Sequence, residues 1–539
     1  MRSPEVGRPA AGWRRGPDDR VGACLRRLLL TAVALALLLA LGSAASATAA
    51  AGPRWLDAAG RPNASARDGL RLLARAADDG LSPQDYGAAD LAGRATALDA
   101  APEAAPAAGA TFERDLETAL LRYFHDLHAG RVDPRALGFR VATRGIAAPD
   151  AAAQLHAAAA AGRLAEAAAS LRPRFVQYEK LREALARYRT LASGAAPERL
   201  PDNATVQVGD AYAGAAALQR RLVAYGDLPE AGPAPGPRYD AALAEGVERF
   251  QRRHGLPATG MLGRATLAAL NVPLSRRVQQ LELALERLRW LPDWGTQPVI
   301  GINIPMFRLW ARDPAAPDGI GADMQVVVGR ALNTQTPVLA DELRYVVFRP
   351  YWNVPRSILL HDVLPALERD PAYLQRNDME IVRGAGDDAQ PVAASPGNLA
   401  LLRQGSLRVR QRPGPKNSLG LVKFIFPNDD NVYLHGTPAT QLFERARRDF
   451  SHGCVRVQDP VALAQWVLRD PPRWTRARIE AAMAATVPQR VDLARPIPVV
   501  LYYLSAMVMP GDGLLHFADD IYGHDARLAR ALRRTQAAG

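Results

Sequence analysis

The chain has 539 residues, more than one hydrophobic core usually organises, so several domains are expected. Its 67 Lys and Arg residues against 55 Asp and Glu residues leave a net charge of +12, which favours an anionic partner such as nucleic acid, lipid or an acidic polymer. A hydrophobic fraction of 48% excludes wholesale disorder, and two cysteines exclude a disulfide scaffold or a zinc ribbon.

The first fifty residues have the order of an export signal. Two arginines precede an apolar run over 28–41, and small residues follow over 42–49. Because a membrane span needs about 20 apolar residues, this shorter run predicts a signal peptide over 1–49 and a periplasmic protein. An uncleaved segment would instead anchor the chain in the inner membrane. Cleavage would leave Cys454 as the only cysteine of the exported chain.

Helical spacing dominates the region that follows. Apolar residues from Phe112 to Leu127 share one face of a predicted helix that ends at Gly130, and a second such face runs from Phe175 to Tyr188. The region lacks the residue types of a catalytic centre. We therefore expect a helical scaffold domain over 50–205.

A compact unit of two or three short helices is predicted at 212–272. Its apolar residues and glycine turns come in the order Leu218-Gln219, Leu222, Val247, Phe250-Gln251, Gly255-Leu256, Gly260 and Thr266-Leu267. This order resembles the small α-helical peptidoglycan-binding module of cell-wall enzymes. An amphipathic linker helix over 273–295 then ends at Pro292, where the ring breaks helical hydrogen bonding.

The spacing changes from helices to strands at Pro298. We expect a mostly-β domain over 296–525 with a helical insertion at about 353–410, followed by a C-terminal tail over 526–539. The predicted strands cover 299–304, 324–328, 345–348, 407–411, 422–426, 432–434 and a hairpin of 498–509 with 514–517. The fold class is therefore multidomain α+β, with a helical first half.

Two short segments of this β region carry chemistry, Val432-Tyr-Leu-His-Gly-Thr-Pro438 and Phe450-Ser-His-Gly-Cys-Val-Arg456. His435, His452 and Cys454 could bind zinc, could be buried structural residues, or could serve nucleophilic catalysis. The zinc interpretation is disfavoured because no close ligand pair and no fourth ligand are evident.

Nucleophilic catalysis explains these residue types best. An imidazole can take the proton of a thiol, whose free pKa is about 8.5. We expect His435 to end a strand and Cys454 to follow Gly453 in a turn that opens a helix, with outward backbone N–H groups ready to hold an oxyanion. Arg456 adds positive charge and could bind a substrate carboxylate.

His435 followed by Ser451-His-Gly-Cys-Val-Arg456 resembles the signature of the L,D-transpeptidases, enzymes with a YkuD-type catalytic domain. Three further segments are similar to the large multidomain subgroup, which joins a scaffold domain, a peptidoglycan-binding module and a catalytic domain with a capping insertion. They are Tyr351-Trp-Asn-Val-Pro355, Pro413-Gly-Pro-Lys-Asn-Ser-Leu-Gly420 and Asp520-Ile-Tyr-Gly-His-Asp525.

The resemblance implies that Cys454 attacks the carbonyl before the D-Ala at position four of a tetrapeptide stem. D-Ala leaves, and the side-chain amine of a second stem takes the acyl group to form a 3→3 cross-link. His435 would be the general base, oriented by the carbonyl of Gly436. Backbone N–H groups around Gly453 and Cys454 would hold the oxyanion with the hydroxyl of Tyr433.

The other residues that the resemblance implies would bind or cover the donor. Ser451, His452 and Arg456 would line the donor site with Gly453, while Trp352 and the insertion would cap it. Peptidoglycan is the expected partner, carbapenems are expected covalent inhibitors, and no cofactor or metal is implied. Without a phosphate loop or an interleaved aromatic–basic stripe, nucleic acid has no support.

Two other functions stay open. Resolution of the same acyl-enzyme by water would make an L,D-carboxypeptidase, and a silent catalytic domain would leave a wall-binding protein. The acceptor could also be a lipoprotein lysine. A cysteine peptidase of the NlpC type is disfavoured because its cysteine precedes its histidine, whereas His435 comes before Cys454 here.

Overall fold

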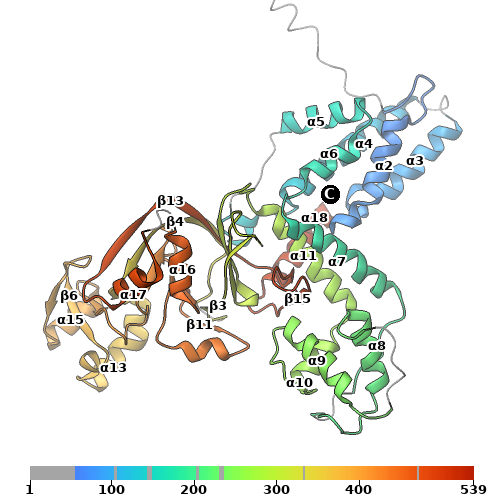
Figure 1. Ribbon diagram of the computed structural model, residues 1–539. Helices are drawn as coiled ribbons and strands as arrows, with labels where there is room; N and C mark the ends of the chain where they lie inside the picture. The colour runs from blue at the N-terminus through green and yellow to red at the C-terminus, as the bar shows by residue number, and fades with distance from the viewer. Residues whose placement is uncertain are drawn as a thin grey trace, which may run out of the picture.

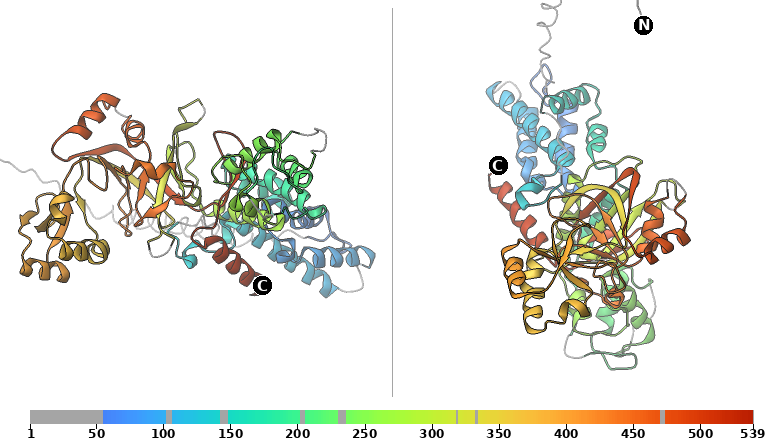
Figure 2. Two further views of the ribbon diagram at one scale, coloured as in Figure 1. Left: turned by 90° about the horizontal axis from the view of Figure 1, so that it is seen from below. Right: turned by 90° about the vertical axis from the view of Figure 1, so that its left-hand side faces the viewer.

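The computed structural model describes residues 55–538 except 102–105, 142–147, 202–204, 230–235, 318, 332–333 and 470–472. Helices gather at one end of an elongated molecule, a large sheet lies in the middle, and a small lobe forms the other end (Figures 1 and 2). The predicted export signal lies outside the described residues. Within the described part of the chain, no helix is long and apolar enough to cross a membrane.

The N-terminal helices have a core of their own. They are α2 (Ala64–Ala74), α3 (Ala88–Ala100), α4 (Pro106–Ala129), α5 (Ala148–Ala160) and α6 (Leu164–Leu171), with 3₁₀ turns at Ala76–Asp79, Pro83–Tyr86 and Pro134–Leu137. The predicted face of α4 is confirmed, because Phe112, Leu116 and Leu120 are fully buried in this core. Helix α7 (Val176–Ser193) belongs elsewhere, since its buried face joins a second, larger core.

That second core joins the middle of the chain to the sheet. It includes α7, the three short helices α8 (Ala215–Tyr225), α9 (Ala241–Arg253) and α10 (Arg264–Leu270), and the long helix α11 (Leu274–Trp290). Two polar contacts reinforce the junction with the C-terminal segment. Arg253 Nη1 donates to the carbonyl of Leu515 at 2.7 Å, and Arg287 forms a buried ion pair with Asp525 at 2.5 Å.

A nine-stranded sheet forms the centre of the catalytic half. Its strands are β1 (Val299–Asn303), β2 (Arg308–Arg312), β3 (Ile320–Gly329), β4 (Leu339–Phe348), β9 (Val422–Ile425), β10 (Leu434–His435), β11 (Asp449–Ser451), β12 (Val455–Val457) and β13 (Gln489–Tyr502). Their order is β11-β3-β12-β10-β9-β4-β13-β1-β2, and pairing of β3 with β2 closes the sheet into a barrel. Helices α16 (Pro460–Val467) and α17 (Arg476–Ala484) add apolar side chains to its core.

The predicted insertion forms a separate lobe with its own apolar core, which we call the capping lobe (residues 352–411). Its helices are α12 (Arg356–Ile358), a π-helical turn (Leu359–Val363), α13 (Leu364–Arg369), α14 (Tyr373–Arg376) and α15 (Pro396–Gln404). They pack on a four-stranded sheet of β5 (Trp352–Asn353), β8 (Arg408–Gln411), β6 (Met379–Arg383) and β7 (Gln390–Val392). The lobe is thus mixed α and β, and the sequence analysis did not predict β6 and β7.

The C-terminal segment differs from its prediction in one respect. The expected strand over 498–509 is divided, because residues to Tyr502 continue β13 while β14 (Ala506–Val508) pairs with β15 (Leu515–Phe517). Ser505 sits at the break, where its hydroxyl donates to Asp525 at 2.5 Å. Residues 526–538 lie within helix α18 (His524–Ala538), which buries Leu528 completely.

Candidate active site

The strand register places four of the predicted residues on one face of the sheet. Leu434 of β10 lies opposite Val455 of the parallel strand β12, and both are fully buried in the core. Because successive side chains in a strand point to opposite faces, the neighbours of these two residues point away from the core. Those neighbours are Tyr433, His435, Cys454 and Arg456.

A tight turn presents Cys454 at the start of β12. Gly453 has φ +114°, a conformation that favours glycine, and its carbonyl accepts a hydrogen bond from the Thr336 hydroxyl at 2.7 Å. The Ser451 hydroxyl accepts from Gly453 N–H at 3.2 Å and donates to the Cys454 carbonyl at 2.5 Å. The prediction that this turn opens directly into a helix is wrong, because Val455 enters a strand that pairs with β10 and β3, and the helix predicted over 460–468 begins only at Pro460 as α16.

The thiol of Cys454 is half-buried and lies against β10 and the loop before it. Its Sγ donates to the carbonyl of Asn431 at 3.8 Å. Burial raises the pKa of the thiol, while hydrogen bonds from Tyr433 and the charge of Arg456 act in the opposite direction. Burial and the neighbouring thiol also raise the pKa of Tyr433, so its hydroxyl remains a hydrogen-bond donor.

The imidazole of His435 is buried and held in one orientation. Its Nδ1 lies 2.5 Å from the carbonyl of Gly436, which fixes the proton on Nδ1 and leaves Nε2 as an acceptor. Burial, with a smaller effect of Arg456, lowers the pKa of His435 to about 3. The Tyr433 ring packs beside it, with ring centroids 5.8 Å apart. At neutral pH this site therefore holds a protonated thiol and a neutral imidazole.

The backbone of the turn offers one free N–H group. Gly453 N–H is engaged by Ser451, and Val455 N–H donates to the Tyr433 carbonyl at 3.1 Å. Cys454 N–H has no acceptor among the residues that the structure describes. This N–H and the Tyr433 hydroxyl are therefore the donors available near the sulfur.

His452 joins the thiol turn to the capping lobe. His452 Nε2 lies 3.6 Å from Asp362 Oδ2, in the π-helical turn of the lobe. Burial and the nearby Arg330 lower the pKa of His452 although Asp362 acts to raise it, so the contact joins a neutral ring to a carboxylate at neutral pH. Arg456 Nε is buried without an acceptor in the described structure.

Trp352 belongs to the capping lobe. It is half-buried on β5, opposite Gln411 of β8, and packs against the core of the capping lobe. Asn417 is buried at the base of the lobe, where its Nδ2 donates to the carbonyls of Pro350 and Arg412 at 3.0 Å each. Asn417 thus ties the entry of the lobe to its exit.

Lys423 of β9 and Asp362 of the lobe were missed by sequence reasoning. Lys423 is the only charged residue of a short apolar strand, a signal that could have singled it out, and it lies directly opposite His435. Asp362 has no comparable signal, because its contact with His452 joins segments far apart in the chain. The described residues contain no group of three side chains suited to a metal ion, which disfavours the zinc interpretation.

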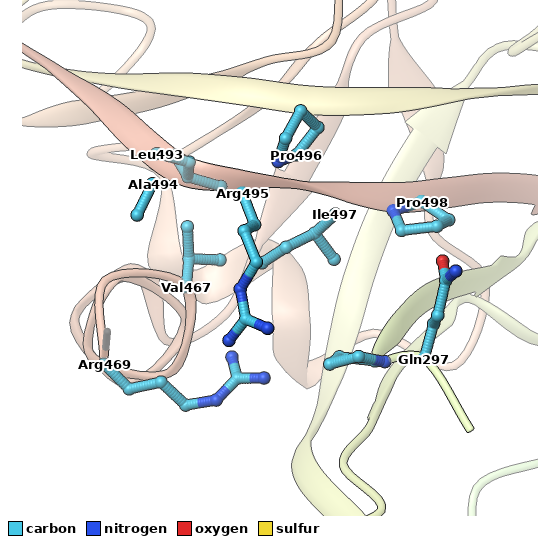
Figure 3. A pocket seen from close by; sticks show the side chains of 10 residues that line it. Gln297, Val467, Arg469, Leu493, Ala494, Arg495, Pro496, Ile497 and Pro498 are labelled. Atoms are coloured by element: carbon cyan, nitrogen blue, oxygen red, sulfur yellow. The ribbon is translucent and has the colours of Figure 1, made fainter. Parts of the chain in front are cut away.

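A separate cavity of about 320 Å³ lies between α16, β13 and the residues before β1. The guanidinium groups of Arg469 and Arg495 face one another across it (Figure 3). None of the site residues predicted from the sequence lines it.

Three family models match the chain. A scaffold domain covers residues 47–185, a "putative peptidoglycan binding domain" covers 213–270, and an L,D-transpeptidase catalytic domain of the YkuD type covers 297–487. Residues 297–487 are an L,D-transpeptidase catalytic domain. The thiol turn, the capping lobe and every barrel strand except β13 lie within this L,D-transpeptidase domain.

The relatives agree with this assignment over part of the chain. A "Putative L,D-transpeptidase" of Haemophilus influenzae is 33% identical over 261 residues, which are 48% of this chain and 51% of the relative. The match thus spans about half the length of that relative. Human matrix metalloproteinase-21 is 58% identical over 50 residues, only 9% of this chain and 8% of that protein, and this short match assigns no activity.

A solved L,D-transpeptidase structure from Xylanimonas cellulosilytica is also similar. The match covers 56% of this chain and 99% of that chain at 16% identity, with a TM-score of 0.18. So low a TM-score adds nothing to the fold described here. Assignment of the L,D-transpeptidase domain therefore comes from the family model and the Haemophilus relative.

Proposed function

We propose that this protein is a peptidoglycan L,D-transpeptidase that forms 3→3 cross-links through a thioester on Cys454. One observation carries the proposal: a half-buried thiol and an imidazole whose Nδ1 is held by a backbone carbonyl are diagonal neighbours on one face of the sheet. Such neighbours are about 7–8 Å apart at the backbone, within reach of a cysteine and a histidine side chain around a substrate.

The proposed reaction begins from a neutral pair. His435 Nε2 takes the proton of the thiol as Sγ attacks the carbonyl carbon before D-Ala, and a tetrahedral oxyanion forms. Cys454 N–H, which has no acceptor among the described residues, and the Tyr433 hydroxyl would donate to it. The carbon–nitrogen bond then breaks, and the imidazolium proton passes to the nitrogen of the departing D-Ala.

The second half of the reaction uses the same groups in reverse. The side-chain amine of another stem attacks the thioester and gives one proton to His435 Nε2. The sulfur–carbon bond breaks, and the proton returns to Sγ as the cross-link is released. The contact of His452 with Asp362 supports a role of the capping lobe in keeping water from the thioester.

Peptidoglycan is the proposed partner at two places. The catalytic domain would bind the stems, and the module over 213–270 would hold the polymer. Both roles require a location outside the cytoplasm, in agreement with the predicted export signal. The net charge of +12 suits a polymer that carries free carboxylates.

The test is incubation of the purified protein with disaccharide-tetrapeptide, followed by mass spectrometry of the products. Dimers that have lost one D-Ala support the proposal. Disaccharide-tripeptide alone would identify an L,D-carboxypeptidase, and unchanged substrate with retained sacculus binding would identify a binding protein. A carbapenem adduct on Cys454 in the intact mass would independently support a reactive thiol.

A further inference from the structure

Lys423 lies next to His435 on the strand farther from Cys454. On β9, Lys423 is directly opposite His435 of β10, and the neighbour of His435 on the far side is Arg456 of β12. Side chains paired in this way share one face of the sheet, and neighbouring strands are about 4.8 Å apart. A row of three basic side chains therefore crosses the face that carries Cys454, with the imidazole in the middle.

Lys423 has the surroundings of an ion-binding residue. Its side chain is half-buried, and among the described residues no carboxylate or carbonyl bonds its ammonium group. The only carboxylate that acts on it is that of Asp387, an exposed residue in the turn between β6 and β7 of the capping lobe. A partly desolvated cation without a bonded partner needs an anion, because burial of an unpaired charge is unfavourable.

The order of residues across the strands indicates which part of the substrate lies over Lys423. The acyl carbon must lie at Cys454 on β12, and the departing nitrogen must lie at His435 on β10. D-Ala carries its carboxylate two bonds beyond that nitrogen. Lys423 lies directly across from His435 on the next strand, on the side away from β12, and a carboxylate that continues away from Cys454 therefore comes within reach of Lys423.

We propose that Lys423 binds the terminal carboxylate of the donor stem and thereby selects tetrapeptides with a free C-terminus. This inference rests on the proposed function, since it needs a donor whose D-Ala departs beside His435. Arg456 is less suited to the task, because it lies on the strand of Cys454 and acts on the thiol itself.

The experiment compares two donors that differ only at the terminus, a disaccharide-tetrapeptide ending in free D-Ala and the same compound ending in D-alaninamide. For the intact protein we expect kcat/KM to be about 10- to 100-fold higher for the acid, as a charge-assisted hydrogen bond is worth about 1.5–3 kcal/mol. Lys423→Met should raise KM for the acid by that factor and leave the amide unchanged. Lys423→Arg should keep most of the preference.

The controls separate the inference from the proposed function. Lys180→Met removes a lysine of helix α7 and should leave kcat/KM unchanged for both donors. If Lys423→Met kept the wild-type ratio of kcat/KM for the acid to kcat/KM for the amide, with or without a loss of activity on both, the inference would be wrong. The proposed function would still stand. If the intact protein released neither D-Ala from the acid nor D-alaninamide from the amide while still forming a carbapenem adduct, the proposed donor itself would be wrong.

Discussion

His435 of β10 and Cys454, directly before the parallel strand β12, lie on the same face of the sheet and two residues apart in register. The pairing of Leu434 with Val455 behind them fixes this offset, because both side chains are fully buried in the core. Slippage by one residue would turn the thiol into the core. The relative position of His435 and Cys454 therefore depends on two apolar residues that take no part in the proposed reaction.

Replacement of Cys454 by Ser should abolish D-Ala release, by at least about 1,000-fold, because a hydroxyl beside a neutral imidazole is a far weaker nucleophile than a thiol. The thermal midpoint should stay within a few degrees of wild type, since the side chains have similar shape. Product analysis and calorimetry measure the two quantities. Residual activity near wild type would rule out the thioester.

The pH dependence of thiol reactivity follows from the protonation states of Cys454 and His435, a neutral thiol beside a neutral imidazole. With the pKa of His435 at about 3 and that of the Cys454 thiol raised, alkylation of the thiol by iodoacetamide should increase steadily above neutrality. No plateau of reactivity should appear between pH 5 and 7, where a thiolate–imidazolium pair would already be ionised. Such a plateau in the rate profile would contradict the assignment.

Acid should also weaken the fold through His435. Its pKa in the folded protein, about 3, lies below the ordinary value of 6.5, so the unfolded chain binds the proton more readily. The contribution to stability is complete above about pH 6.5 and is lost as the pH falls toward 3. Thermal scans of wild type and His435→Gln over this range should converge in acid, and parallel curves would contradict a buried neutral ring.

Replacement of Tyr433 by Phe should slow acylation by roughly 100-fold, with little change in KM, because it removes a hydroxyl that bonds the sulfur and is placed to bond the oxyanion. Single-turnover formation of the carbapenem adduct measures this rate. Tyr345→Phe, on β4 of the same sheet, is the matched control and should leave the rate unchanged. Equal effects of the two variants would indicate general damage to the sheet.

The contact between Asp362 and His452 should control what resolves the thioester. Asp362→Asn removes the charge that faces the thiol turn across 3.6 Å, and we expect a larger share of disaccharide-tripeptide relative to dimer. Asp370→Asn breaks an ion pair with Arg376 within the lobe and is the control. An unchanged ratio of tripeptide to dimer in Asp362→Asn would show that the contact does not shield the thioester.

Local patterns were enough to predict part of the structure. The face of α4, the helix over α7 and the end of a strand at His435 follow from spacing alone. The strand after Cys454 could not be predicted, since its three residues are held by pairing with β10 and β3. Asp362 could not be predicted for the same reason, because it meets His452 only when distant segments come together, whereas Lys423 had a signal as the one charged residue of a short apolar strand.

The second core has a mechanical consequence. Helices α8–α10 share continuous apolar packing with α11, with the β14–β15 hairpin and with the barrel, and Arg253 bonds that hairpin directly. Helices α8–α10 therefore cannot move relative to the barrel as a domain on a flexible linker would. The distance between the module over 213–270 and the thiol turn is then a set length, so under the proposed function the protein would act as a gauge that joins strands at one spacing.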